Sequence, residues 1–287
     1  MFFSPLIRAL QLPLVGLANC IQRVCVNHVS LEQTDDKPHV LKRRLWFAWV
    51  LIFPANIVFR FRQVPLKVLH NGEWIRWERT VKSKLRNEVI LTGTALRCET
   101  ISGQPLSELL ADRLQKWLRE PNSAKTESAE SLAYLKTATI ALKNLHKISV
   151  QQDGGKPSVM LSHGDASISN VMYCANTSRA EWFDFDLRHD LQIDADQRSA
   201  DDLRSLLFSA GCFLREEDLE PLVQMVKHEY QCERVWTALQ NQLSSSRFWL
   251  DLFHLSQTRR LKRRSLTAGL ALPLVEKTLV DLVLKVD

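Results

Sequence analysis

The chain has 287 residues and a formal net charge of +6; 45% of its residues are hydrophobic and 24% are charged. These values are ordinary for a globular protein with a sizeable core, and the length allows two modest domains or one large domain with two lobes. The six cysteines form no CxxC pair and have no metal-ligand spacing to histidines, which argues against a zinc site and a disulfide framework and favours reduced thiols.

Two apolar stretches near the N-terminus are candidates for membrane segments. Residues 1–21 contain Arg8 and two prolines and have no basic leader, so they fit a signal peptide poorly. Residues 45–59 number only fifteen and include Pro54 and Asn56, which favours a buried or interfacial helix over a membrane span. We therefore expect a cytoplasmic protein, with peripheral membrane contact left open.

In chain order, the first half of the sequence predicts alternating helices and short strands. The polar stretch 32–38 indicates a loop at the end of an N-terminal extension, residues 1–40, and a hydrophobic helix is expected to follow as far as Phe61. Periodicity and turn residues then predict a strand at 64–69, a helix at 73–86, strands at 88–91 and 96–101, and a helix at 106–118.

The second half is predicted to be mainly helical, with one embedded hairpin. A loop near 120–130 precedes a helix at 131–147, the hairpin strands lie at 171–174 and 181–185, and everything beyond Asp201 is expected to be helix. The eight tryptophans lie at helical spacings and are expected in the core. The fold class is therefore α+β, with a small mixed half before a larger helical half.

The segment Ser162–Asn170 and the segment Trp182–Asp186 carry the clearest chemical pattern. Asp165 is followed by Asn170 five positions later and by Asp184 fourteen positions after that. A match to H-G-D-x-x-x-x-N arises by chance on the order of once per thousand chains of this length. Phosphoryl transfer needs a base near the acceptor hydroxyl and oxygen ligands for magnesium, and these three side chains supply them.

At these residues the chain resembles the protein-kinase-like superfamily, specifically its small-molecule branch of aminoglycoside and choline phosphotransferases and lipopolysaccharide sugar kinases. The resemblance is clear over about residues 98–210. It implies a two-lobed fold with an abbreviated N-lobe at residues 41–103 and a catalytic C-lobe at residues 104–287. It also implies ATP and Mg²⁺, with Asp165 as the catalytic base and with Asn170 and Asp184 as metal ligands.

Four further residues of this region have predicted roles at the site or in support of it. His163 is placed in the catalytic loop, and we interpret it as a packing and backbone-orienting residue rather than an acid–base group. Asp186 is a candidate for assisting at the metal, or else a hydrogen-bonded turn residue. The pair Asp201 and Asp202 resembles the helix start that steadies the catalytic loop, and Asp201 as a simple N-cap is the alternative.

The nucleotide-binding half is less complete. No glycine lies between Gly16 and Gly72, and no GxGxxG or GxxxxGK[ST] motif occurs. The stretch ending at Lys67 resembles the strand whose lysine grips the α- and β-phosphates; Glu78 is then its predicted ion-pair partner, with Glu73 as second choice. A surface lysine on a strand is the alternative for Lys67.

Residues 101–106 resemble the hinge whose backbone groups hold the adenine, which places Glu99 and Ile101 among the predicted nucleotide-binding residues. Arg60 and Arg62 could supply charge in place of a glycine loop. ATP is expected, with GTP not distinguished from it.

The acceptor is expected to be small. Protein kinases carry an arginine where Gly164 stands, and only sixteen residues separate Asp184 from Asp201, with no Ala-Pro-Glu segment. A small molecule or a lipid-linked sugar is therefore favoured over a protein. A catalytically silent pseudokinase acting as a membrane-associated or interaction scaffold is the alternative function, because the glycine loop is missing.

Two basic runs, at residues 42–44 and 259–264, are interpreted as solvated helix faces. Contact with anionic lipid is the alternative. Nucleic-acid binding is not expected, because no recognised fold or stacking motif accompanies the runs.

Overall fold

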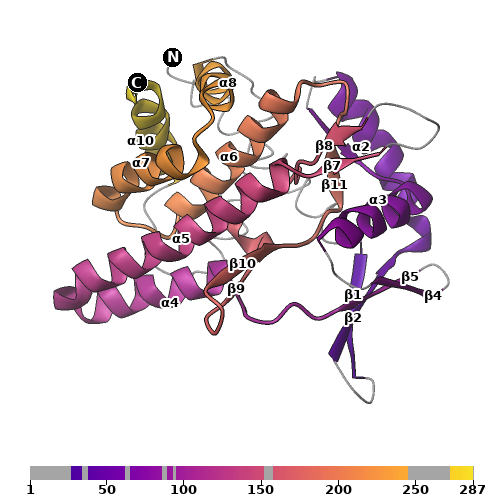
Figure 1. The fold of residues 1–287 in the computed structure, drawn as a ribbon, viewed down its shortest axis with the longest axis horizontal. Coiled ribbons are helices and arrows are strands. Elements are labelled where there is room, and N and C mark those ends of the chain that lie inside the picture. Colours follow the sequence, from indigo (N-terminus) through magenta and orange to yellow (C-terminus); the bar gives the residue numbers. More distant parts are fainter. Residues whose placement is uncertain are drawn as a thin grey trace. The chain divides into compact units, whose positions relative to one another are not determined.

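The computed structural model describes residues 27–33, 38–61, 65–85, 89–92, 95–151, 158–244 and 272–286. The chain divides into two compact units. Of the described residues, the first unit contains those up to Thr100 together with the later segment Phe185–Arg188, and the second unit contains the rest. Each unit combines helices with small sheets, as expected for an α+β chain (Figure 1).

The first unit contains an antiparallel sheet of four strands. Its order is β1 (Asn27–Gln33), β2 (Pro38–Arg44), β5 (Ala95–Glu99) and β4 (Val89–Thr92). The helix expected before Phe61 was thus wrong at its start, because residues 38–44 form a strand. Side chains alternate along a strand, so Lys42 and Arg44 share a face, and both are buried while Arg43 is exposed. The interpretation of this run as a solvated helix face was also wrong.

The helices of the first unit are α2 (Trp49–Phe61), which follows a short 3₁₀ turn, and α3 (Asn71–Lys84). Between them, β3 (Leu66–Val68) pairs with β11 (Leu187–His189) from far along the chain. The Asn56 amide of α2 donates to the carbonyl of Val68 and accepts from its N–H, at 2.8 and 2.9 Å. These two hydrogen bonds hold the helix against the strand.

The second unit is mainly helical. Its helices are α4 (Leu106–Arg119), α5 (Ala124–His146), α6 (Ala195–Gly211), α7 (Leu219–Tyr230), α8 (Glu233–Ser244) and α10 (Leu272–Lys285). Its strands are β6 (Gln104–Pro105), β7 (Ser149–Val150), β8 (Val159–Met160), β9 (Val171–Cys174) and β10 (Arg179–Trp182), with the sheet orders β10-β9-β6 and β7-β8. In Figure 1, α4 and α5 lie side by side, in accordance with their contacts.

Two boundaries in the second unit differ from the predictions. The expected loop near 120–130 is helical from Ala124, because the buried Glu127 carboxylate accepts a hydrogen bond from Arg113 of α4 at 3.1 Å and forms an ion pair with Lys116 of α4 at 2.6 Å, which hold this turn in place. Helix α6 begins at Ala195, and its N-cap is Asp194, whose side chain accepts from the N–H of Asp196. Asp201 as an N-cap was therefore wrong.

Within the described part of the chain, no helix is both long and apolar enough to cross a membrane. The stretch 1–21, Arg62 and the basic run 259–264 lie outside the described residues. Trp74 and Trp77 of α3 are buried as expected, whereas Trp49 is 61% exposed, so its predicted place in the core was wrong.

Candidate active site

The loop that contains Asp165 is held by a carboxylate from helix α6. Asp202 accepts hydrogen bonds from the backbone N–H groups of His163 and Gly164, at 2.6 and 2.9 Å, one at each oxygen. Gly164 has φ of +82°, a conformation that only glycine adopts without strain. An arginine would be strained at this position, so the backbone conformation itself favours glycine at 164. The loop-steadying acid expected from the pair Asp201 and Asp202 is Asp202.

Asp202 is itself anchored by buried histidines. His146 at the end of α5 contacts it through Nε2 at 2.9 Å and contacts Tyr230 through Nδ1 at 2.6 Å. Burial acts to raise the pKa of the Asp202 carboxyl, but the charges of His189 and His146 and the hydrogen bond from His146 outweigh it and leave that pKa below its usual value. A carboxylate that stays ionised in the interior is a strong acceptor for the two loop N–H groups.

Asp165 and Asn170 are locked together by the loop. The Asn170 side-chain amide donates to the carbonyl of Asp165 at 2.9 Å, so its Nδ2 is committed to the backbone and its Oδ1 is turned away from that bond. Between them, the N–H of Ile168 donates to the Ser209 hydroxyl of α6 at 3.1 Å. The loop therefore has a fixed shape, with Asp165 partly exposed and Asn170 buried.

Asp184 follows directly from the hairpin of β9 and β10. The backbone N–H of Phe183 donates to the carbonyl of Asn170 at 3.0 Å, and His163 Nε2 donates to the carbonyl of Phe183 at 2.8 Å. The segment before Asp184 is thus bonded at both its N–H and its C=O to the Asp165 loop. These bonds hold all three predicted catalytic and metal-ligand residues on one scaffold in the second unit.

The backbone of Asp184 is strained. Its φ is +67°, and only Ser178 and Gln231 share a positive φ among the described non-glycine residues. Ser178 lies in the hairpin turn, and Gln231 is the left-handed cap that ends α7, whereas Asp184 is in neither a turn nor a cap. Such conformations cost about 1–3 kcal/mol and cluster at functional sites, where surrounding bonds impose them.

His163 is buried completely and acts on the backbone. Its Nδ1 accepts from the N–H of Asp165 at 3.2 Å while its Nε2 donates to Phe183, which fixes one neutral tautomer. Burial lowers the pKa of His163 below its ordinary 6.5, against the opposing effects of Asp202 and the Phe183 carbonyl. The ring also packs edge-on against Trp182, with centroids 5.2 Å apart. This geometry is that of a positioning residue.

The donor set fits magnesium by its chemistry. Asn170 offers an amide oxygen and Asp184 a carboxylate, which are hard ligands, and magnesium commonly takes only one or two protein ligands beside phosphates and water. Among the described residues, no group of three or more His, Cys, Asp or Glu side chains could hold a metal ion by itself.

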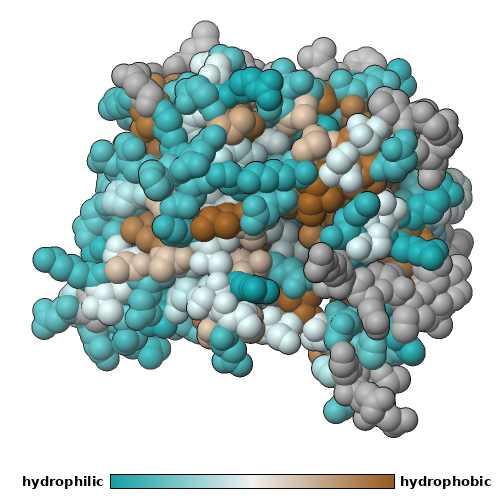
Figure 2. Space-filling view, viewed as in Figure 1, coloured by the Kyte–Doolittle hydropathy of each residue, from teal (hydrophilic) through white to brown (hydrophobic). Residues whose placement is uncertain are grey.

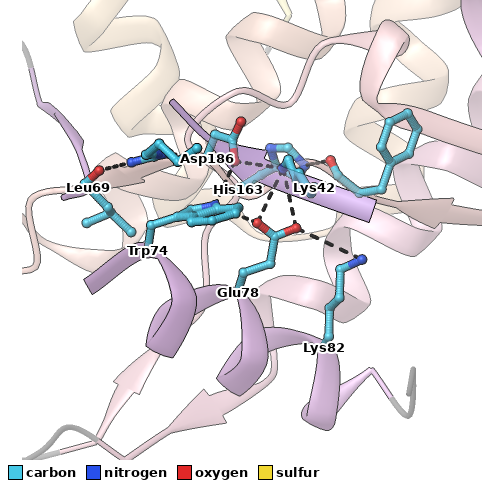
Figure 3. Close-up of polar contacts among 9 residues, drawn as sticks. Lys42, Leu69, Trp74, Glu78, Lys82, His163 and Asp186 are labelled. Carbon is cyan, nitrogen blue, oxygen red and sulfur yellow. Dashed lines mark hydrogen bonds and ion pairs between the residues drawn. The ribbon is translucent and has the colours of Figure 1, made fainter. Parts of the chain in front are cut away.

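A second charged cluster lies in the first unit. Lys42 of β2 donates to Glu78 of α3 at 3.3 Å and to Asp186 at 2.6 Å, and the Trp74 indole N–H donates to the same two carboxylates at 2.7 and 2.8 Å. Figure 3 shows Trp74, Glu78 and Lys82 projecting from one helix, with Lys42 above the Glu78 carboxylate. Arg44 stacks over the Trp74 ring, 4.7 Å from its centroid, and donates to the carbonyl of Leu69. The cluster is a buried lysine–glutamate ion pair with a second acid.

The predicted ion pair of Lys67 with Glu78 was wrong. Lys67 contacts Glu73, the second choice, at 3.0 Å, and both side chains are more than one-third exposed. Desolvation acts to raise the pKa of Glu73, but the hydrogen bond and charge of Lys67, together with the charges of Arg188 and His70, outweigh it and leave that pKa below its usual value. Glu78 is 1% exposed and takes Lys42, because the pairing of β2 with β5 places Lys42 on the inner face of the sheet. The predicted role of Lys67 as a phosphate ligand stays a prediction.

The hinge-like residues lie where the chain passes from the first unit to the second. Glu99 ends β5 opposite His39 of β2, and Ile101 begins the second unit; both are half-buried. Just beyond, Gly103 has φ of +126°, and a Cβ there would lie 2.3 Å from the carbonyl oxygen of Tyr173 in β9. The hinge-like segment is thus pressed against the hairpin that leads to Asp184. Adenine contacts at Glu99 and Ile101 stay a prediction.

Sequence reasoning missed Lys42, Trp74 and the link of Asp186 to the first unit. Lys42 lies in a basic run that was interpreted as a helix face. The sequence signal that could have identified it is the spacing of Lys42 and Arg44, because residues two apart point to the same side of a strand.

No protein-family model and no curated protein matches the chain. Among solved structures, a similar one is an ethanolamine kinase from Plasmodium vivax, with 10% sequence identity and a TM-score of 0.47, over 90% of this chain and 79% of that one. The function is therefore inferred from this chain's own residues.

Proposed function

We propose that the protein is a magnesium-dependent phosphotransferase that moves the γ-phosphoryl group of ATP to a hydroxyl of a small molecule or lipid-linked sugar. The observation that carries the proposal is the bonding of Asn170 to the Asp165 carbonyl, on a loop that Asp202 holds and that His163 ties to the residue before Asp184. The proposed fold is protein-kinase-like, with the first unit as an abbreviated N-lobe and the second as the catalytic C-lobe.

In the proposed reaction, Asp165 accepts the proton of the acceptor hydroxyl. The acceptor oxygen forms a bond to the γ-phosphorus while the bond from that phosphorus to the bridging oxygen breaks, and ADP leaves with that oxygen. Magnesium held by Asn170 and Asp184 would neutralise the phosphate charge. His163 and Asp202 do no chemistry themselves; they keep the base and the two ligand residues at fixed positions.

For the nucleotide, we propose Lys42 as the phosphate-binding cation of the first unit. A phosphate-binding lysine needs a rigid position, and the buried ion pair with Glu78 supplies it, whereas Lys67 sits in an exposed pair whose geometry solvent can loosen. Asp186 shares the Lys42 ammonium, so its role as a metal assistant is the less favoured of its two predicted roles.

The short connection after Asp184 supports a small acceptor. Helix α6 begins at Ala195, so ten residues, 185–194, separate it from Asp184, and three of these form β11. This leaves no segment long enough to dock a peptide strand.

A second candidate function is a catalytically silent scaffold. One observation favours it: Lys42 already contacts two carboxylates, so its charge is compensated before any nucleotide binds. The intact loop of Asp165 and Asn170 favours the enzyme.

A thermal-unfolding titration of the full chain with ATP and Mg²⁺ tests the proposal. Nucleotide at a hundredfold excess over its dissociation constant should stabilise the fold by about 2.7 kcal/mol. Asp184→Asn should remove the magnesium-dependent part of this stabilisation and reduce phosphoryl transfer to water or to candidate sugar and amino-alcohol acceptors by at least about a thousandfold. Asp190→Asn, the same change at an exposed turn, is the matched control.

Normal turnover by the Asp184→Asn variant would exclude this metal site. No stabilisation of the wild-type chain at millimolar ATP and Mg²⁺ would favour the scaffold instead.

A further inference from the structure

Helix α2 is apolar on almost its whole circumference. Its core-facing side contributes Ile52 and Phe59, which pack with the preceding Ala48 against Val68 and Leu187. A helix that is apolar all round normally has both sides covered, by a protein core or by lipid. Here only one side is covered by the residues that the structure describes.

The side of α2 next to this core-facing side exposes a contiguous apolar stripe. Trp49, Phe53 and Ile57 recur every four residues and are 61%, 61% and 50% exposed, with Val50 beside them at 50%. At 100° per residue, Trp49, Phe53, Ile57 and Arg60 fall within one quarter of the helix surface. Brown side chains reach the surface in the upper right of Figure 2, where Figure 1 places α2. Scattered exposed apolar residues need no partner, but a contiguous stripe indicates one.

The exposed charges that lie close to the stripe in sequence are cationic. Residues 37–72 contain seven lysines and arginines and no aspartate or glutamate, although the chain's 32 acidic residues would place about four in a stretch of this length. Of the seven, Lys42 and Arg44 are buried against Asp186 and Lys67 pairs with Glu73, so these three do not count toward the surface charge. Arg60 continues the stripe at the C-terminal end of α2, and Arg43 lies shortly before its start; both are exposed. This charge complements an anionic partner.

We propose that this face of α2 docks on the surface of an anionic bilayer. The helix has 13 residues and spans about 20 Å, less than the roughly 30 Å of a hydrocarbon core, so it would lie in the interface rather than cross it. Trp and Phe side chains insert at the boundary between headgroups and acyl chains, while arginines attract acidic headgroups. The docking proposal is argued from the exposed face of α2 and does not depend on the phosphotransferase proposal.

A second copy of the chain is a weaker occupant. A twofold interface between two copies of this stripe would bring Arg60 and Arg43 near their like-charged counterparts, without acids from residues 37–72 to compensate them.

Vesicle flotation of the full chain tests the proposal. Vesicles of phosphatidylcholine with 30 mol% phosphatidylglycerol should bind the wild-type chain at least about tenfold more tightly than vesicles of phosphatidylcholine alone, and raised salt should reduce this preference. The double variant Trp49→Ser, Phe53→Ser should lose at least about tenfold in affinity, and Arg60→Ala about fivefold. These variants leave residues 1–26 and the basic run 259–264 in place, so a loss identifies α2.

The double variant Leu118→Ser, Leu284→Ser is the matched control. These leucines lie in the second unit and are 43% and 42% exposed. The control variant should bind vesicles as tightly as the wild type. Equal affinity of the wild type for both vesicle types, or unchanged binding by the α2 double variant, overturns the proposal. So does a wild-type dimer in sedimentation that the α2 variant converts to monomer and that binds no vesicles.

Discussion

At the residue scale, Lys42 is held by two carboxylates that come from distant parts of the chain. Glu78 lies 36 positions away and Asp186 lies 144 positions away. Removing one partner of a buried ion pair is costly because the remaining charge is left without compensation. Loss of the Lys42 ammonium should therefore destabilise the fold more than loss of the Lys67 ammonium, which lies in an exposed pair with Glu73.

Lys42→Met should lower the free energy of unfolding by about 3 kcal/mol, because Glu78 loses its closest cation, and should abolish stabilisation by ATP and Mg²⁺. Lys67→Met removes the same charge from an exposed pair and should change stability by less than about 1 kcal/mol. Urea unfolding with and without nucleotide measures both. Loss of the nucleotide effect in the Lys67 variant alone would return the phosphate-binding role to Lys67.

His163 predicts a dependence of stability on pH. Its folded pKa lies below 6.5 because burial disfavours the charged ring, so below about pH 6.5 the unfolded chain takes up a proton that the folded chain does not. The stabilising contribution is complete above 6.5 and falls as the pH drops toward the folded pKa, with a slope of up to about 1.4 kcal/mol per pH unit.

The difference between wild type and His163→Gln isolates this effect from the other histidines. Unfolding free energies measured between about pH 5 and pH 7 should fall less steeply in His163→Gln than in wild type. His228→Gln, which replaces an exposed histidine, should retain the wild-type slope. An unchanged slope in His163→Gln would contradict the buried neutral state.

At the scale of elements, the hairpin of β9 and β10 links the hinge-like segment to Asp184. Strand β6 pairs with β9, and Gly103 immediately before β6 approaches Tyr173 so closely that no side chain fits. The same hairpin ends at the residues that bond to the Asp165 loop. A change at Gly103 should therefore disturb both the hinge-like segment and the hairpin.

Gly103→Ala should destabilise the protein by at least about 2 kcal/mol, because its Cβ would collide with the Tyr173 carbonyl and its φ of +126° suits only glycine. Gly72→Ala, in α3 with no atom within 4 Å of the added Cβ, should be neutral or stabilising by up to about 1 kcal/mol. Thermal unfolding compares the two. Equal stability of both variants would show that the contact at Gly103 is not rigid.

At the scale of the whole molecule, the first unit is not continuous in sequence. Strand β3 obtains its partner, and Lys42 its second carboxylate, from Phe185–Arg188, which follows Asp184 directly. The segment after the candidate metal ligand is thus part of the first unit, while Asp184 itself belongs to the second. We therefore expect the first unit to need this late part of the chain in order to fold.

A fragment of residues 27–100 should therefore show no cooperative unfolding transition in circular dichroism. Its β3 has an unpaired edge, its core lacks Leu187, and Lys42 lacks Asp186. Appending residues 185–190 through a flexible linker should restore part of the transition. Cooperative unfolding of the fragment without that addition would contradict the dependence.

The sequence by itself determined the features that neighbouring residues specify. Periodicity predicted α3, α4 and the hairpin strands to within a few residues, because an amphipathic face is a local property. It also brought out Asp165, Asn170 and Asp184, whose separations are short and whose residue types carry the chemistry. Their predicted catalytic and metal-binding roles await the experiments above.

Only the tertiary structure decided which charges meet. Glu78 pairs with Lys42 because β2 joins β5 in a sheet. Residues 38–44 form a strand because the neighbouring strands of that sheet pair with them. The local sequence, which precedes an apolar helix, does not reveal these partners. Likewise, the contact of Glu127 with α4 accompanies helix from Ala124 onward, in a stretch whose composition predicts a loop. The physical reason is common to these cases: contacts between residues far apart in sequence override local propensity, and no local pattern contains them.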